Sequence, residues 1–184
     1  MRIISGKLKG RKIKAVPGFS TRPTSDRLRE TIFNIIAGQV QGSVVLDLFS
    51  GTGALGIEAI SRGAKQVCLI DNSIAAITTI KQNLAICNIS SQAKILKWDI
   101  SRNLNCLGNF DSVIDLVFMD PPYAKGLIKP ALINLCKSGS LLDKALIIIE
   151  HNDQEALKKP FSDFSLKDQK KYGKTLVSFF QYML

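Results

Sequence analysis

The stretch that most constrains the fold is residues 44–56, which read V-V-L-D-L-F-S-G-T-G-A-L-G. A short apolar, β-branched run contains Asp47 near its end, and Gly51 and Gly53 then precede a segment with helical spacing. This order predicts a buried parallel strand, a tight glycine turn and the start of a helix. Because glycines let a ligand approach the backbone and a helix start offers free N–H groups, the turn predicts a site for a nucleotide-type cofactor.

The identity of that cofactor depends on the acids around the turn. Residues 51–56 satisfy G-x-G-x-x-G, the dinucleotide fingerprint, and Asp71 follows the next predicted strand. Asp47 stands before the turn, where its carboxylate would repel a pyrophosphate but attract the ammonium and sulfonium of S-adenosylmethionine. Asp71 can take ribose hydroxyls in either cofactor, so it does not discriminate. A glycine turn that only packs helix on sheet remains a structural alternative.

Regular alternation of strands and helices predicts an α/β fold with a mostly parallel, Rossmann-like sheet of seven strands. The last segment lacks a following helix, so we expect it to close the sheet as an antiparallel strand. Ligands in such sheets bind at the carboxyl ends of the strands. The expected strands are 44–49, 66–71, 93–97, 114–119, 144–150, 164–171 and 175–182, and four carboxylates fall at or just past strand ends, namely Asp47, Asp71, Asp99 and Asp120.

The motif Asp120-Pro121-Pro122-Tyr123 follows the strand 114–119. Two prolines stiffen the loop and fix the directions of its carbonyls, and the aromatic ring can stack on a planar base. A nucleobase amine is a poor nucleophile, because its lone pair is delocalised into the ring. Acceptors at Asp120 and at the Pro121 carbonyl would orient such an amine for in-line attack on a methyl group. The chain has no Cys-Pro dipeptide, which disfavours a cysteine nucleophile.

Positive charge is concentrated at the N-terminus. The formal net charge is +10, and residues 1–30 hold nine Lys/Arg against two acids, which gives +7 there and +3 elsewhere. We expect residues 2–5 and 11–15 to pair as a β-hairpin, followed by a helix from Thr24 or Ser25 to about Ala37. A basic segment on a nearly balanced body predicts binding to a polyanion. The expected organisation is a basic extension at 1–40 and a catalytic domain at 41–184.

Cysteine usage and hydropathy indicate the compartment. Four separated cysteines, no C-x-x-C and a single histidine, His151, predict no metal site and a reducing cytoplasm. No apolar run approaches the roughly 20 residues that span a bilayer, so we expect no membrane partner. We also expect His151, at a strand end, to be structural or exposed rather than catalytic.

Four blocks of the sequence together resemble the bacterial 16S rRNA (guanine-N2)-methyltransferase family, D type. They lie at residues 2–13, 21–30, 46–64 and 118–123, and the run E-A-I-S-R-G-A at 58–64 is not required of methyltransferases in general. The resemblance implies a class I methyltransferase fold, S-adenosylmethionine as the methyl donor and S-adenosylhomocysteine as product. It also implies a monomer acting on a guanine N2 of 16S rRNA within an assembling small ribosomal subunit.

Matching positions imply roles for individual residues. The cofactor is expected to contact Asp47, Phe49, Ser50, Gly51, Gly53, Asp71, Asn72, Asp99 and Asp120, and the target base is expected to contact Asp120, Pro121, Pro122 and Tyr123. RNA is expected to contact Arg2, Lys7, Arg11, Lys12, Arg22, Arg27 and Arg29. Arg27 and Arg29 have an equal alternative, because they can pair with Asp26 and Glu30. The chain departs from the family in having Asp71 where Glu is commoner, and in the bulky Trp98 beside Asp99.

Three alternatives stay open at this point. Adenine-N6 methylation can use the same proline loop to orient the amine and the same aromatic ring to stack the base. The short chain, however, lacks an obvious extra domain for recognising a DNA sequence. An NAD-dependent oxidoreductase is permitted by the glycine fingerprint and opposed by Asp47 and the basic segment. A non-catalytic RNA-binding protein is opposed by the complete set of strand-end acids.

Overall fold

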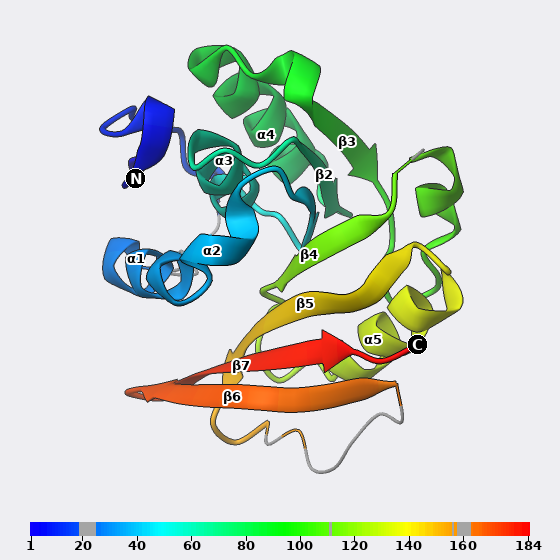
Figure 1. Cartoon of the computed structure of the whole chain (residues 1–184). Coiled ribbons are helices and arrows are strands. Elements are labelled where there is room, and N and C mark those ends of the chain that lie inside the picture. The colour runs from blue at the N-terminus through cyan, green and yellow to red at the C-terminus, as the bar shows by residue number, and fades with distance from the viewer. Residues whose placement is uncertain (19–24, 111, 156, 158–162) are drawn as a thin grey trace.

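A computed structural model describes residues 1–18, 25–110, 112–155, 157 and 163–184 (Figure 1). Arg22, one of the residues expected to contact RNA, lies outside this described part. The strands form one sheet in the order β3-β2-β1-β4-β5-β7-β6. Their bounds are β1 Val44–Leu48, β2 Gln66–Asp71, β3 Ala93–Lys97, β4 Ile114–Met119, β5 Leu141–Asn152, β6 Phe164–Tyr172 and β7 Thr175–Tyr182.

The first five strands are parallel, and β7 runs antiparallel between β5 and β6. The predicted mostly parallel, seven-stranded sheet with an antiparallel last strand is confirmed. The structure adds that β7 lies inside the sheet, with β6 at its edge. Since β1 pairs with both β2 and β4, the segments that follow these three strands leave the same edge of the sheet.

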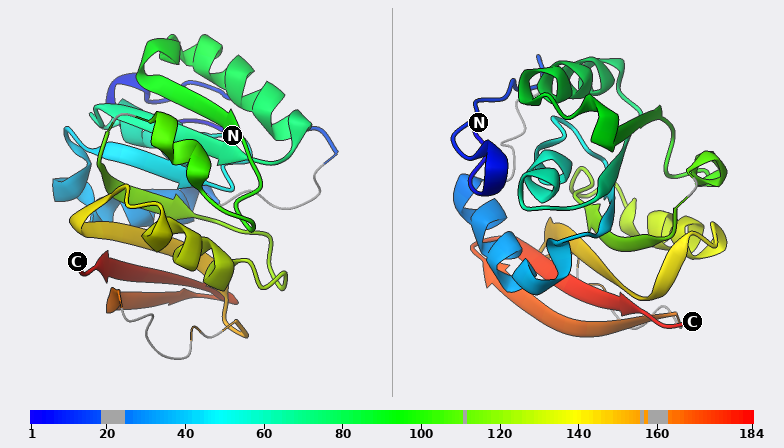
Figure 2. Two further views of the ribbon diagram at one scale, coloured as in Figure 1. Left: turned by 90° about the vertical axis from the view of Figure 1, so that its right-hand side faces the viewer. Right: turned by 45° about the horizontal axis from the view of Figure 1, so that its top comes forward.

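Helices cover both faces of the sheet (Figures 1 and 2). One apolar core joins the N-terminal segment and helices α1, α3 and α4 to the sheet, while the other lies against α5 and residues 100–107. On α4, Ile80 and Leu84 are buried, whereas Ile74 in the first turn is exposed. The helix bounds are α1 Asp26–Ile35, α2 Ala37–Val40, α3 Ala54–Ser61, α4 Ile74–Cys87 and α5 Ile128–Lys137.

Helix α1 begins at the predicted cap. Ser25 accepts a hydrogen bond from the Leu28 N–H at 3.2 Å and so satisfies one of the open donors of the first turn. Leu28, Ile32 and Phe33 are buried, and Phe33 packs on Phe118 of β4 with ring centroids 5.2 Å apart. Through this contact α1 covers the sheet directly behind the Asp120 loop.

In the N-terminal segment the two arms expected to form a β-hairpin do pair antiparallel, but only over a short length. Its strands are reduced to an isolated bridge between Arg2 and Lys12, around a short 3-10 helix at Gly6–Leu8. Backbone hydrogen bonds still join the two arms, from Ile3 N–H to the Arg11 carbonyl at 2.9 Å and from Ile13 N–H to the Met1 carbonyl at 3.1 Å. Other backbone donors of the segment go to side chains of α3. Glu58 accepts from the N–H groups of Ile4 and Ser5 at 2.8 and 3.0 Å. These contacts hold the segment as a docked loop on α3.

Candidate functional site

The glycine turn joins β1 to α3 through three positive backbone φ angles, 60° at Phe49, 54° at Gly51 and 76° at Gly53. Ser50 fixes the turn, because its hydroxyl donates to the Asp47 carbonyl at 2.6 Å, and the Gly53 N–H donates to the Ser50 carbonyl at 2.7 Å. A Cβ added at Gly51 would meet only the Phe49 carbonyl oxygen, at 4.0 Å. The turn therefore faces open space in which a ligand can approach the backbone.

Asp47 is almost fully buried, at 1% exposure, and its Oδ2 accepts the Gly56 N–H at 3.0 Å. Gly56 lies in the first turn of α3, so the carboxylate from β1 caps the helix that follows the glycine turn. Burial raises the pKa of Asp47 to about 7, against the lowering effect of the Gly56 hydrogen bond. This capping contact was not predicted from the sequence.

Asp71, at the end of β2, is half-buried, and its carboxylate accepts hydrogen bonds from two backbone N–H groups. Its Oδ2 accepts from the Gly51 N–H and its Oδ1 from the Ser73 N–H, both at 2.9 Å. The carboxylate thus ties the glycine turn to the start of α4, where the Ser73 hydroxyl caps the helix. The structure places Asp71 beside the turn, as its expected role at the cofactor ribose requires.

A cavity of about 410 Å³ lies beyond Asp71, and its lining includes Asn72 and Asp99, two residues expected to contact the cofactor. The Trp98 indole N–H donates to the Asn103 carbonyl at 3.0 Å, which fixes the ring at the cavity wall. Asp99 accepts from the Ser101 hydroxyl at 2.6 Å, and this bond, more than the ion pair with Arg102, lowers the pKa of Asp99. The lining comprises Asn72, Lys97, Trp98, Asp99, Arg102 and Asn103.

The loop Asp120–Tyr123 leaves β4 beside the end of β5. Met119 pairs with Ile149 in the parallel register, so Asp120 and Glu150 follow at the next position on neighbouring strands. The Tyr123 hydroxyl donates to Glu150 Oε1 at 3.0 Å and lies 3.3 Å from the Thr175 hydroxyl. Burial, first among several causes, raises the pKa of Tyr123, so the hydroxyl stays a donor at neutral pH. Glu150 and Thr175 were not predicted, although Glu150 ends an expected strand on the same edge.

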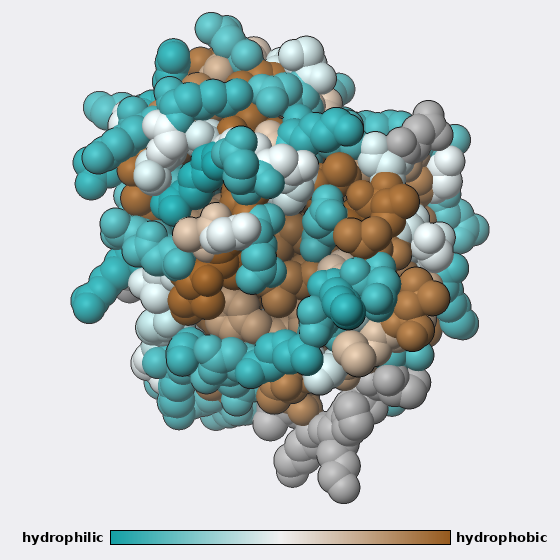
Figure 3. Space-filling view, viewed as in Figure 1, coloured by the Kyte–Doolittle hydropathy of each residue, from teal (hydrophilic) through white to brown (hydrophobic). Residues whose placement is uncertain are grey.

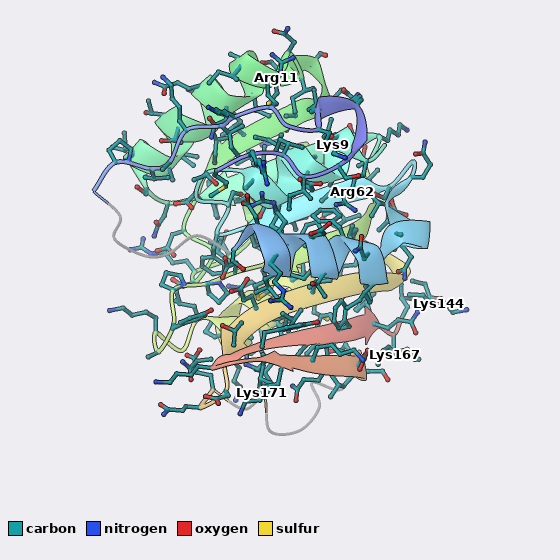
Figure 4. All side chains as sticks on the ribbon, turned by 90° about the vertical axis from the view of Figure 1, so that its left-hand side faces the viewer. Lys9, Arg11, Arg62, Lys144, Lys167 and Lys171 are labelled. Atoms are coloured by element: carbon teal, nitrogen blue, oxygen red, sulfur yellow. The ribbon has the colours of Figure 1, made fainter. Side chains whose placement is uncertain are left out.

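The basic N-terminal side chains are mostly at the surface. Lys7 donates to the Gln92 side chain at 3.1 Å, and Arg11 donates to the Ile86 carbonyl at 3.2 Å. Figure 4 shows Lys9 and Arg11 on the same side of the molecule as Lys144, Lys167 and Lys171 of the β5–β6 region. Figure 3 shows mostly hydrophilic residues on the surface over α4 and the N-terminal segment. The exposed candidates for RNA contact are Arg2, Lys7, Arg11, Lys12 and Arg27.

Arg29 is a correction to the expected RNA contacts. Its side chain is 0% exposed, and Nη2 donates to the Arg2 carbonyl at 2.5 Å and to Asp26 at 3.1 Å. Glu58, also fully buried, lies 3.7 Å from Arg29 Nε and 2.8 Å from Arg62 Nε. Arg29 faces the core because its apolar neighbours on α1 do, so it fastens the N-terminal segment and cannot reach a phosphate.

His151 is buried within β5 and faces away from solvent. Its Nε2 lies 2.8 Å from the Ser178 hydroxyl on β7, and burial lowers the pKa of the ring. Of the two expectations for His151, structural or exposed, the buried ring bears out the first. Within the described residues no helix is long and apolar enough to cross a membrane. That part of the chain also contains no group of three His, Cys, Asp or Glu side chains arranged to hold a metal ion.

The sheet with its antiparallel β7, the open glycine turn after β1 and the acids after β2 and β4 define a class I methyltransferase fold. A family model described as "Conserved hypothetical protein 95" matches residues 1–181. Ribosomal RNA small subunit methyltransferase D of Escherichia coli (strain K12) is 34% identical over 181 residues, which cover 98% of this chain and 89% of that protein. The chain belongs to this methyltransferase D family.

Two further relatives support this assignment. YlbH of Bacillus subtilis (strain 168) is 36% identical over 181 residues, which cover 98% of each chain. The solved structure of yhhF from Escherichia coli is 33% identical, with a TM-score of 0.86 over 100% of this chain and 98% of that one. The similarity thus includes the N-terminal segment as well as the sheet.

Proposed function

We propose that this chain transfers a methyl group from S-adenosylmethionine to the exocyclic N2 of a guanine in 16S rRNA. The observation that carries the proposal is the pairing of β1 with β4, which brings the glycine turn and the Asp120–Tyr123 loop to one edge of the sheet. Relatives named for small-subunit ribosomal RNA support the choice of substrate. In this proposal the enzyme is a cytoplasmic monomer, and its substrate is an assembling small subunit.

The residues at the glycine turn fit S-adenosylmethionine. This cofactor supplies a methyl group made electrophilic by a positively charged sulfur. Asp71 lies next to Gly51 and has the acceptors that ribose hydroxyls need, and the adjoining cavity with Asn72 and Asp99 has room for a planar base. Asp47, expected from the sequence to contact the ammonium of the methionine moiety, is buried and caps α3, so it supports the glycine turn from within. The open space before Gly51 leaves the backbone accessible.

The Asp120 loop would orient the amine. In the proposed complex Asp120 and the Pro121 carbonyl accept the two N2–H bonds, which directs the nitrogen lone pair at the methyl carbon. Asp120 then receives the proton that N2 loses as the new N–C bond forms. The Tyr123 ring, 42% exposed, offers a face on which the guanine can stack. Because guanine N2 is inaccessible in a paired stack, the target is a base presented in a loop or flipped outward.

The test is transfer of tritiated methyl groups to undermodified rRNA and to small-subunit particles, with nucleoside analysis of the product. Labelled N2-methylguanosine is the expected result. Asp120→Ala should lose at least 100-fold in rate and keep its affinity for S-adenosylmethionine, since oriented acceptors act mainly in the transition state. Asp143→Asn, on an exposed part of β5, is the matched control. Label in N6-methyladenosine would replace the guanine proposal, and absence of cofactor binding would reopen the dinucleotide alternative.

A further inference from the structure

A second carboxylate stands beside Asp120 at the base end of the site. Glu150 is 7% exposed, and the register of β4 on β5 places it next to Asp120 at the carboxyl ends of the two strands. Side chains at paired positions of neighbouring strands point to the same face of a sheet. Glu150 and Asp120 therefore face the same side of the sheet, which is also the side of Asp47.

The Tyr123 hydroxyl contacts the Glu150 carboxylate and is itself held by Thr175. Tyr123 from the substrate loop contacts Oε1 at 3.0 Å, and Thr175 of β7 contacts the same phenol at 3.3 Å. A carboxylate has about four acceptor positions, so the bond from Tyr123 leaves it capacity for a further donor.

We infer that Glu150 selects guanine by accepting the N1–H of the target base while Asp120 holds the adjacent N2 amine. This inference rests on the proposed function. The Watson–Crick edge of guanine presents N1–H and N2–H₂ as neighbouring donors, which two adjacent carboxylates complement. Adenine presents an unprotonated N1 beside its amine, and that lone pair would face the Glu150 carboxylate and be repelled. Tyr123 acts here as a positioning residue, because its hydroxyl holds Glu150 while its ring is available for stacking.

The discriminating probe is 2-aminopurine, which keeps the 2-amino group but has an acceptor in place of the guanine N1–H. Once the modified guanine is located, it is replaced by 2-aminopurine in rRNA assembled by ligation. The wild-type enzyme should prefer guanine by about 10- to 100-fold in kcat/KM, the range of one good base-edge contact. Glu150→Gln can donate to N1 of 2-aminopurine, so its guanine rate should fall, its 2-aminopurine rate should rise, and the preference should approach one.

The outcomes separate the possible failures. Absence of guanine methylation by the wild type would overturn the proposed function itself. Guanine methylation with equal use of 2-aminopurine would leave that function intact and overturn the role of Glu150, whatever the variant does. Equal losses on both bases in Glu150→Gln, with cofactor affinity retained, would mean that Glu150 only orients Tyr123, and would also overturn the inference. Glu30→Gln, exposed on α1, is the control and should keep the wild-type preference.

Discussion

Asn83 of α4 donates its side-chain N–H to the backbone carbonyl of Thr52 in the glycine turn, at 2.9 Å and across 31 residues of sequence. The same amide accepts the Lys14 N–H at 2.7 Å and donates to the Lys14 carbonyl at 3.1 Å. Asn83 is 0% exposed. One buried amide therefore fixes both the turn expected to bind the cofactor and the end of the basic segment expected to bind RNA.

Asn83→Ala should lower the free energy of unfolding by about 2–4 kcal/mol, because it leaves several backbone groups without their buried partner. It should also weaken binding of both S-adenosylmethionine and RNA, since both surfaces lose their shared support. Urea unfolding and two binding titrations measure these effects. Asn34→Ala, at an exposed position on α1, is the control. Unfolding energies within 0.5 kcal/mol of wild type would contradict the structural role of Asn83.

Asp47→Asn should remove a pH dependence of stability. The folded-state pKa is about 7 against an ordinary value of 3.8, so between these two pH values the folded chain keeps a proton that the unfolded chain has released. Stability contributed by this group therefore falls as pH rises through that window. The difference corresponds to roughly 3–5 kcal/mol. Urea unfolding from pH 4 to pH 8 should show Asp47→Asn gaining on wild type as pH rises, and parallel curves would refute the assignment.

Arg29→Met should destabilise the fold by about 3–5 kcal/mol, because it removes one member of a buried charge network and leaves Glu58 with less compensation. Arg27→Met changes an exposed arginine of the same helix and should shift stability by less than 0.5 kcal/mol. The effects on RNA affinity should be reversed. Compared at equal folded fraction, Arg27→Met should bind RNA more weakly than the wild type, and Arg29→Met should bind it as the wild type does. Thermal unfolding and RNA titration together distinguish the two arginines.

Gly6→Ala should loosen the N-terminal segment. Gly6 has φ +78°, and an added Cβ would lie 1.9 Å from the Ser61 carbonyl oxygen. Gly10 has φ +81° with nothing within 4 Å of such a Cβ, so Gly10→Ala shares the backbone strain without the collision. Gly6→Ala should therefore be the more destabilising of the two, by about 1–3 kcal/mol, the usual cost of overpacking. Amide exchange at Ile4 and Leu8 reports on the docked segment, and equal protection in both variants would be the contrary outcome.

Neutralising Arg11 and Lys12 together should weaken RNA binding and flatten its dependence on salt. Each lost phosphate contact reduces the slope of log affinity against log salt by about 0.7–0.9. A double variant of Lys144 and Lys167, on the β5–β6 region of the same side (Figure 4), tests whether the effect belongs to the N-terminal segment. An unchanged slope for Arg11 and Lys12 would remove them from the RNA surface.

The succession of strands along the chain, and the edge of the sheet that carries the site, could be predicted from periodicity and from the acids at strand ends. Most predicted strands agree with the structure to within a few residues, and the glycine turn, Asp71 and Asp120 share one edge as expected. Burial of Arg29 could not be predicted, since a charged residue on an amphipathic helix ordinarily faces solvent. The Tyr123–Glu150 contact also required the register of β4 on β5, because 27 residues separate the two. The docking of the N-terminal segment depended on its fit to Ser61 and Glu58.

The position of β7 between β5 and β6 has a consequence for folding. Among the described strands β6 pairs with β7 alone, and β5 presents one of its edges to the same strand. Until residues 175–182 join the sheet during folding, one edge of β5 is uncovered, and β6 has no strand beside it. Unpaired edges of this kind are prone to aggregate. The folding chain is therefore prone to aggregate until Val177, Phe179 and the rest of β7 pair with both β5 and β6.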